Sequence, residues 1–183
     1  MKISIFALAG IVAGTAIAIA TVNTPVASAD TSTVNEESAF RVGVDPSSLH
    51  CLAQNIYFES RGSNLADMAA VANVVLNRVR DRRYPDTICG VVQQSKRAKN
   101  GQPLKNQCQF SWYCDGISDV AKNKDKWEQA QTIAYQMLAE GRFRGLAEGA
   151  THYHANYVKP YWATDKGMTL IGRIGEHIFY RWE

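Results

Sequence analysis

Glu59 is the residue whose position in the sequence most clearly indicates chemistry. It lies between Phe58 and Ser60 in the stretch 49–62, near the end of a segment whose apolar residues recur at helical spacing. A carboxylate at a helix C-terminus opposes the helix dipole, and apolar neighbours remove water from it, so both effects raise its pKa. A general acid that breaks a glycosidic bond needs such a raised pKa. The alternative interpretation is a solvated carboxylate paired with Arg61.

A second group of candidate residues mixes hydrogen-bonding side chains with flat aromatic rings. Sugars require both, because their hydroxyl groups need directed polar partners while their C–H faces pack on aromatic surfaces. One source is the segment 107–116, in which Phe110 is interpreted as a core residue, and another is the aromatic segment 150–166. The expected substrate contacts are Gln109, Ser111, Trp112, Tyr153 and Tyr157.

The histidines suggest a competing chemistry. His152 and His154 alternate along a short extended segment, so they point to the same side, and His177 is a third possible ligand. Such a set could hold zinc in a metal-dependent amidase that separates peptide from sugar. The chain lacks an H-E-x-x-H motif, so the preferred interpretation has no metal and no cofactor.

Two helices that meet at a tight corner are predicted to position Glu59. Gly62 can end the first helix in a left-handed conformation, and Asn64 can cap the second, with Asp67 three residues later. The second helix is expected to continue to Arg80, because its apolar residues keep the helical period. These residues are Leu65, Met68, Ala69, Ala72, Val75, Leu76 and Val79.

The remaining elements are predicted from turn formers and apolar spacing. Thr87 to Gln94 indicates a short helix or turn, Lys96 to Lys105 a basic loop, and Asp125 to Gly141 a scaffold helix capped by Asp125. The segment 171–182 is expected to return as a strand that pairs with 151–155, which gives a small sheet beside the helices.

The chain resembles the SleB/CwlJ family of cell-wall hydrolases. The resemblance rests on motifs in five stretches, which follow in the expected order: 53–62, 69–79, 84–92, 108–112 and 174–181. It covers residues 49–181. The resemblance implies a lysozyme-like catalytic domain, and the expected fold class is therefore α+β, mainly helical, with a small antiparallel β-sheet.

The resemblance also indicates a mechanism with a single catalytic carboxyl group. Glycosidases usually employ two carboxylates, but no setting argues for a second role at the available candidates. These candidates are Asp115, Asp119, Asp165 and Glu176. Lytic transglycosylases, which the family resembles, need one acid/base because the substrate's own N-acetyl group assists. The hypothesis is that Glu59 acts in a peptidoglycan lytic transglycosylase or muramidase; the alternatives are the amidase and a non-catalytic wall-binding module.

The N-terminus indicates export. Residues 1–29 have the apolar run and small-residue cleavage site of a signal peptide, residues 30–45 are expected to form a disordered leader, and 46–183 the catalytic domain. An uncleaved membrane anchor is the alternative to cleavage after Ala29. We expect an exported monomer, in the periplasm or in the extracellular space and cell wall, that binds peptidoglycan glycan strands and is free of the membrane after signal cleavage. A formal net charge of +3 is too small to indicate nucleic acid.

Four cysteines in an exported chain are compatible with two disulfides. Three pairings are possible. We favour Cys108 with Cys114, which closes a short loop, and Cys51 with Cys89, which ties the Glu59 helix to the segment after the second helix. A four-cysteine zinc site is disfavoured because the C-x-x-C spacing is absent.

Overall fold

The computed structural model describes residues 43–183. The predicted signal peptide and most of the predicted leader lie outside the described residues. The elements in chain order are α2 (Pro46–Glu59), α3 (Leu65–Arg80), α4 (Ile88–Val92), β1 (Ser95–Arg97), β2 (Pro103–Cys108), η1 (Ser111–Cys114), α5 (Lys124–Leu138), β3 (His152–Ala155), η2 (Tyr161–Thr164), β4 (Met168–Ile174) and β5 (His177–Trp182). Within residues 43–183 no helix combines the length and the apolar character that crossing a membrane requires.

The predicted helical corner is confirmed. Helix α2 begins earlier than the apolar stripe, because the Asp45 side chain accepts hydrogen bonds from the backbone of the first turn. The chain then turns through Gly62, whose φ of +82° is the left-handed conformation that glycine adopts at little cost. The Asn64 side chain caps α3 by accepting from the backbone N–H of Asp67 at 3.0 Å. The corner therefore places Glu59 at the last residue of α2.

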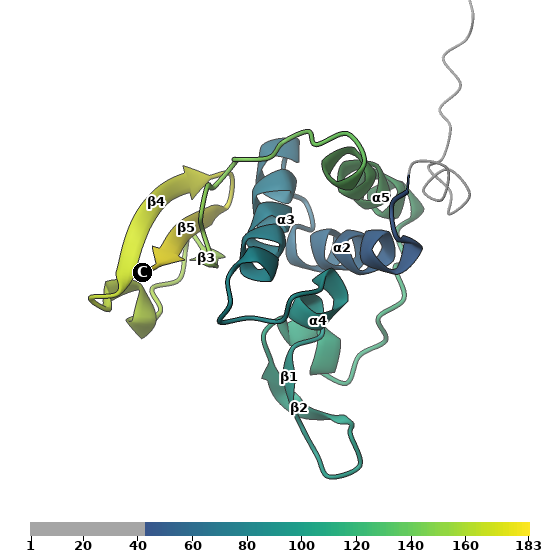
Figure 1. The fold of residues 1–183 in the computed structure, drawn as a ribbon, viewed down its shortest axis with the longest axis horizontal. Helices are drawn as coiled ribbons and strands as arrows, with labels where there is room; N and C mark the ends of the chain where they lie inside the picture. The colour runs from purple at the N-terminus through teal and green to yellow at the C-terminus, as the bar shows by residue number, and fades with distance from the viewer. Residues whose placement is uncertain (1–42) are drawn as a thin grey trace, which may run out of the picture. The chain divides into compact units, whose positions relative to one another are not determined.

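Helices α2, α3, α4 and α5 enclose one hydrophobic core, and α2 and α5 pack closely against each other (Figure 1). Its fully buried members include Leu52, Ile56, Val75, Ile133 and Met137. The expected cap of α5 is wrong by two residues. Asn123, rather than Asp125, caps this helix, because its side chain reaches the backbone N–H of Lys126 at 3.0 Å.

The segment that we expected to be a basic loop contains a β-hairpin. Strands β1 and β2 pair antiparallel, with Ser95 opposite Cys108 and Arg97 opposite Pro103. The connection passes through Gly101 at a φ of +84°, and the prediction of a loop missed the strands on both sides of this turn. Their side chains are mostly exposed, and short polar strands of this kind lack the apolar alternation that identifies a strand from sequence.

A three-stranded antiparallel sheet in the order β3-β5-β4 lies beside α3, on the side of α3 away from α2 and α5 (Figure 1). The predicted pairing with 151–155 is confirmed, but the segment 171–182 spans two strands, because a turn at Gly175 separates β4 from β5. His177 and Phe179 share the buried face of β5. Phe179 packs with Val71 and Val74 of α3, which holds the sheet on that helix.

The structure pairs Cys51 with Cys89 and Cys108 with Cys114, the pairing favoured from the sequence. The first bridge connects α2 to α4. The second connects the end of β2 to the end of η1.

The two bridges are expected to differ in their contribution to stability. Closing a longer loop removes more entropy from the unfolded chain, so replacing both Cys51 and Cys89 by Ala, residues 38 apart, should lower the free energy of unfolding by about 4 kcal/mol. The same change at Cys108 and Cys114, 6 residues apart, should cost about 2 kcal/mol. Urea unfolding of both double variants measures the difference, and an equal loss in the two would contradict the loop-length argument.

Candidate active site

Glu59 is half-buried at the C-terminal end of α2 and is bound by a tyrosine from the sheet. The Tyr153 hydroxyl donates a hydrogen bond to Glu59 Oε2 at 2.9 Å. Burial raises the pKa of Glu59 above its ordinary value of 4.5, although the Tyr153 hydrogen bond and the nearby charges of His177 and Arg78 act in the opposite direction. The raised pKa that the sequence predicted for this carboxyl group is therefore present.

Tyr153 lies on the buried face of β3. Its ring contacts Phe179 and His177, with ring centroids 5.7 and 5.1 Å away. Burial and the neighbouring Glu59 carboxylate raise the pKa of Tyr153 well above its ordinary value, so its hydroxyl remains a donor at any pH relevant to the protein. We expected Tyr153 to contact substrate, but its hydroxyl is directed at Glu59.

Arg78 provides a buried positive charge at this site. Its side chain extends from α3 under the sheet, where Nε donates to the Thr151 carbonyl at 2.8 Å. The guanidinium lies over the rings of Tyr84 and Phe110, 5.2 and 5.3 Å from their centroids. Within residues 43–183 its Nη1 has no hydrogen-bond partner. Burial lowers the pKa of Arg78, yet an arginine keeps its charge, which favours the ionised form of Glu59.

A buried hydrogen bond between His177 and Asp67 fastens the sheet to the start of α3. Asp67, which has no exposed surface, accepts from His177 Nδ1 at 2.8 Å and from the backbone N–H of Glu176 at 3.1 Å. Burial alone would raise the pKa of Asp67, but the hydrogen bonds from His177, Ser63 and Glu176 outweigh it and lower that pKa. Gly175 is required beside this pair, because a Cβ there would lie 2.6 Å from the Asp67 side chain.

Sequence analysis did not identify Arg78 or the Asp67–His177 pair as parts of the site. Arg78 follows Val71 and Val74 at helical spacing, so it occupies the apolar face that α3 turns toward the sheet. A charged residue on a buried stripe is the signal that could have found it. Asp67 was interpreted as a capping residue, which concealed its contact with a residue 110 positions away.

The sheet register contradicts the proposed three-histidine metal site. His152 and His154 lie on the outer face of β3, where both contact Trp162. His177 pairs opposite Ala155 and shares the other face with Tyr153, where it is bound to Asp67. The three imidazoles therefore cannot converge on one ion. In the part of the chain that the structure describes, no group of three or more potential ligands has metal-binding geometry.

The other expected substrate contacts are found in different environments. Gln109 and Ser111 are exposed near the hairpin, and Tyr157 is 83% exposed in the loop after β3. The expectation of a groove position is wrong for Trp112, which is 7% exposed. It stacks on Phe58 at a centroid distance of 4.7 Å, so its ring is part of the core, as is that of Phe110.

The four carboxylates considered for a second catalytic role form no hydrogen bonds with the residues that surround Glu59 in the described chain. Asp115 accepts from the backbone of Ile117, and Glu176 accepts from the Asn156 side chain. Burial raises the pKa of Asp119, and the negative charge of Asp115 raises it further. Asp165 is exposed in the loop before β4. Among residues 43–183, none of the four hydrogen-bonds to Glu59, Tyr153 or Arg78.

Removing the Tyr153 hydroxyl should raise the pKa of Glu59 further. The hydroxyl stabilises the carboxylate, so Tyr153→Phe removes an interaction that lowers the pKa and leaves the desolvation that raises it. The carboxyl carbon of Glu59 can be titrated by NMR in both proteins, with Glu59→Gln used to assign its signal. An unchanged or lower Glu59 pKa in Tyr153→Phe would contradict the hydrogen bond's electrostatic role.

Comparisons with known proteins bear on this arrangement. A family model described as Cell Wall Hydrolase matches residues 62–180. A spore cortex-lytic enzyme from Halalkalibacterium halodurans is 31% identical over 156 residues, which are 85% of this chain and 41% of that protein. This chain thus spans less than half of that relative's length.

Two solved structures are similar. The catalytic domain of the Bacillus cereus SleB protein is 25% identical with a TM-score of 0.55, covering 75% of this chain and 91% of that one. The catalytic domain of the germination-specific lytic transglycosylase SleB from Bacillus anthracis is 26% identical with a TM-score of 0.55, covering 76% and 98%. The family match begins three residues after Glu59, so the argument for this carboxyl group rests on its geometry.

Proposed function

The chain belongs to the cell wall hydrolase family, and we propose that it is an exported peptidoglycan lytic transglycosylase in which Glu59 is the single catalytic acid and base. The bond cleaved is the glycosidic linkage between N-acetylmuramic acid and N-acetylglucosamine. The observation that carries the proposal is a half-buried carboxyl group with a raised pKa, held at one oxygen by Tyr153. The chemistry named for the Bacillus anthracis relative supports the same reaction class.

In the first step Glu59 acts as an acid. Because Oε2 accepts the Tyr153 hydrogen bond, Oε1 is the oxygen that carries the transferable proton. This proton passes to the glycosidic oxygen as the bond to the muramic acid C1 breaks, and the N-acetyl carbonyl of the same sugar attacks C1. N-acetylglucosamine leaves with a new hydroxyl group.

In the second step the ionised Glu59 acts as a base. Tyr153 and the positive charge of Arg78 favour this carboxylate, so they limit the rise in the Glu59 pKa that burial causes. Glu59 takes the proton of the 6-hydroxyl while that oxygen attacks C1 and displaces the N-acetyl oxygen. The product is a 1,6-anhydro sugar, and Glu59 regains the proton that the next cycle needs.

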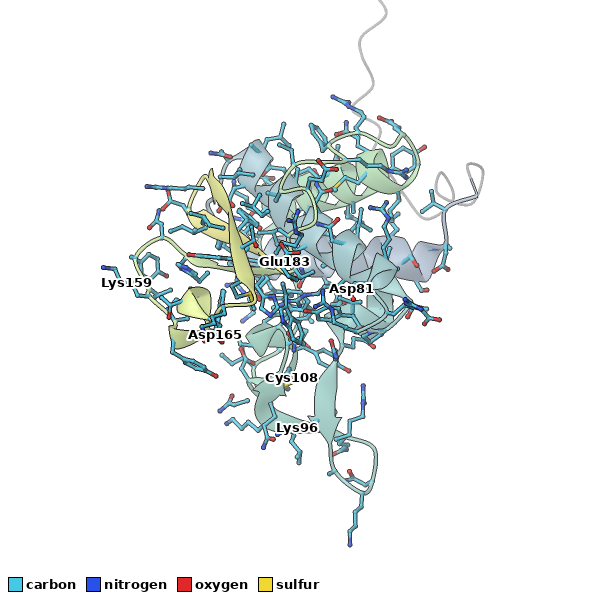
Figure 2. All side chains as sticks on the ribbon, turned by 60° about the vertical axis from the view of Figure 1, so that its left-hand side comes forward. Asp81, Lys96, Cys108, Lys159, Asp165 and Glu183 are labelled. Atoms are coloured by element: carbon cyan, nitrogen blue, oxygen red, sulfur yellow. A yellow bond between two sulfur atoms is a disulfide. The ribbon has the colours of Figure 1, made fainter. Side chains whose placement is uncertain are left out.

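Gln109, Ser111 and Tyr157 stay as proposed substrate contacts. Gln109 lines a hollow of about 370 Å³ beside the hairpin, together with Gln94, Ser95, Lys96, Gln107 and Cys108. The exposed amides that line this hollow suit the hydroxyl groups of peptidoglycan, and the Lys96 ammonium suits the carboxylates of its stem peptides. Figure 2 shows Lys96 and Cys108 on this hairpin.

Replacing Glu59 by Gln should remove activity while preserving the fold. The amide keeps the shape of the carboxyl group but has no proton to transfer, so the rate should fall by about two to four orders of magnitude. The measurement is mass spectrometry of soluble products released from purified sacculi, with circular dichroism as the check on folding. Products that end in 1,6-anhydro-N-acetylmuramic acid, absent with the variant, are the expected result.

Other products would revise the mechanism in defined ways. Reducing N-acetylmuramic acid would mean that water, rather than the 6-hydroxyl, completes the reaction. Free stem peptides with intact glycan would establish an amidase, and full activity of Glu59→Gln would overturn the role of Glu59.

The pH dependence of cleavage should follow the titration of Glu59. The first step needs the protonated acid, so the rate should be sustained above pH 4.5 and fall as pH rises through the raised pKa. In Tyr153→Phe this alkaline limb should move to higher pH, in parallel with the NMR titration. A limb that moves to lower pH, or that persists in the residual activity of Glu59→Gln, would assign it to another group.

A further inference from the structure

The outer face of the sheet, opposite the face that carries Tyr153, holds an aromatic cluster that the catalytic proposal does not use. Trp162 folds over this face, with its ring centroid 5.3 Å from His152, 5.6 Å from His154 and 5.5 Å from Tyr180. His154 and Tyr180 also stack on each other, at 5.4 Å. The loop between β3 and β4 is thereby packed against the sheet.

A small hollow opens at one end of this cluster. Its volume is about 180 Å³, and it is lined by His152, Asp165, Gly167, Met168 and Trp182. Pockets that enclose a drug-sized ligand hold about 300–1,000 Å³. The hollow is therefore suited to one unit of a polymer, with the rest of the polymer outside. Figure 2 shows Asp165 on the loop between β3 and β4, well separated from Lys96 on the hairpin.

Trp182 is held in place although 42% of it is exposed. The Arg83 guanidinium lies 4.5 Å from its ring centroid and donates to the carbonyls of Trp182 at 2.7 Å and Glu183 at 3.0 Å. Asp81 in turn accepts hydrogen bonds from Arg83 at both carboxylate oxygens. An aromatic ring that is fixed before binding loses little conformational entropy when a ligand packs on it.

The polar groups of the hollow suit a neutral ligand with hydroxyl and amide groups. Burial, and then the charges of Arg78 and Arg83, lower the pKa of His152 to about 4, so its imidazole is uncharged at neutral pH. Its Nδ1 is engaged with the Thr151 hydroxyl at 3.0 Å, which leaves Nε2 for a ligand. Asp165 forms no salt bridge within residues 43–183, so its carboxylate can accept from hydroxyl groups.

We propose that this hollow, formed by Trp182, His152 and Asp165, is a second carbohydrate site that binds one N-acetylhexosamine unit of a glycan strand. An indole ring supplies the apolar surface that sugar C–H groups need, and the imidazole and carboxylate supply directed polar partners. The site lies on the sheet face opposite Tyr153, so it retains the strand without occupying Glu59. The identification of this strand as peptidoglycan rests on the proposed function.

The apolar surroundings support a surface that meets a large ligand. Most of the exposed large apolar residues of the described chain lie in or beside this sheet, whereas Leu65 lies on α3 and Ile117 and Val120 lie in the loop before α5. Those in the segment 157–182 are Tyr157, Val158, Tyr161, Leu170 and Trp182. Leu170, 61% exposed on the same outer face, does not line the hollow and is a matched control.

The test measures binding in the Glu59→Gln background, so that glycan is not consumed. Trp182→Ala and Asp165→Asn should each weaken binding to insoluble peptidoglycan by about three- to tenfold, and Leu170→Ala by less than about twofold. Asp165 is exposed in a loop, so its variant tests the site even if Trp182→Ala fails to fold. Addition of soluble N-acetylglucosamine tetramer should also shift the indole N–H signal of Trp182 in NMR spectra.

The outcomes separate this site from the catalytic proposal. Unchanged binding in both Trp182→Ala and Asp165→Asn, or a Trp182 signal indifferent to the tetramer, would overturn the site even if sacculi are cleaved. Weakened binding in these variants would support the site. If the protein that retains Glu59 also releases nothing from sacculi, the proposed reaction would be rejected while the site stands. Competition by a lysine-containing stem peptide but not by the tetramer would overturn the assignment to a sugar.

Discussion

The buried hydrogen bond between Asp67 and His177 is the interaction on which the arrangement of the site depends. It joins the first turn of α3 to the beginning of β5, and β5 is the central strand of the sheet. Because β3 pairs along β5, this contact also sets the position of Tyr153 relative to the end of α2. A carboxylate with no exposed surface requires such partners, since an unpaired buried charge costs several kcal/mol.

Opposing effects act on Glu59, and together they suit the two roles proposed for it. Desolvation dominates and favours the neutral acid, while Tyr153, His177 and Arg78 favour the carboxylate. Burial without these partners would hold the proton too tightly for a base, and the partners without burial would release it too readily for an acid. The orphan Nη1 of Arg78 fits this balance, because a guanidinium not neutralised by a direct ion pair keeps its field available to Glu59.

The local parts of this site could be predicted from sequence, and the long-range parts could not. The corner at Glu59 is specified by residues close together in the chain, because the apolar residues keep a helical period, Gly62 ends the first helix and Asn64 caps the second. Trp112 was misplaced because aromatic residues serve equally in cores and in sugar-binding grooves, and only its stacking on Phe58 distinguishes these uses. The contact of Asp67 with His177 spans 110 positions, and a capping role explained Asp67 well enough that nothing local pointed further.

The strand period of two separates the chemistry of the sheet into two faces. Tyr153 and His177 share one face, where they bind Glu59 and Asp67, whereas their neighbours His152 and Ile178 lie on the other face, so adjacent residues belong to different environments. This alternation makes a shared metal site for the three histidines impossible. It also allows the outer face to bind a ligand without disturbing the acid. A sheet three strands wide thereby positions the proposed catalytic carboxyl group with one face, while the other face carries the aromatic cluster and the proposed sugar site.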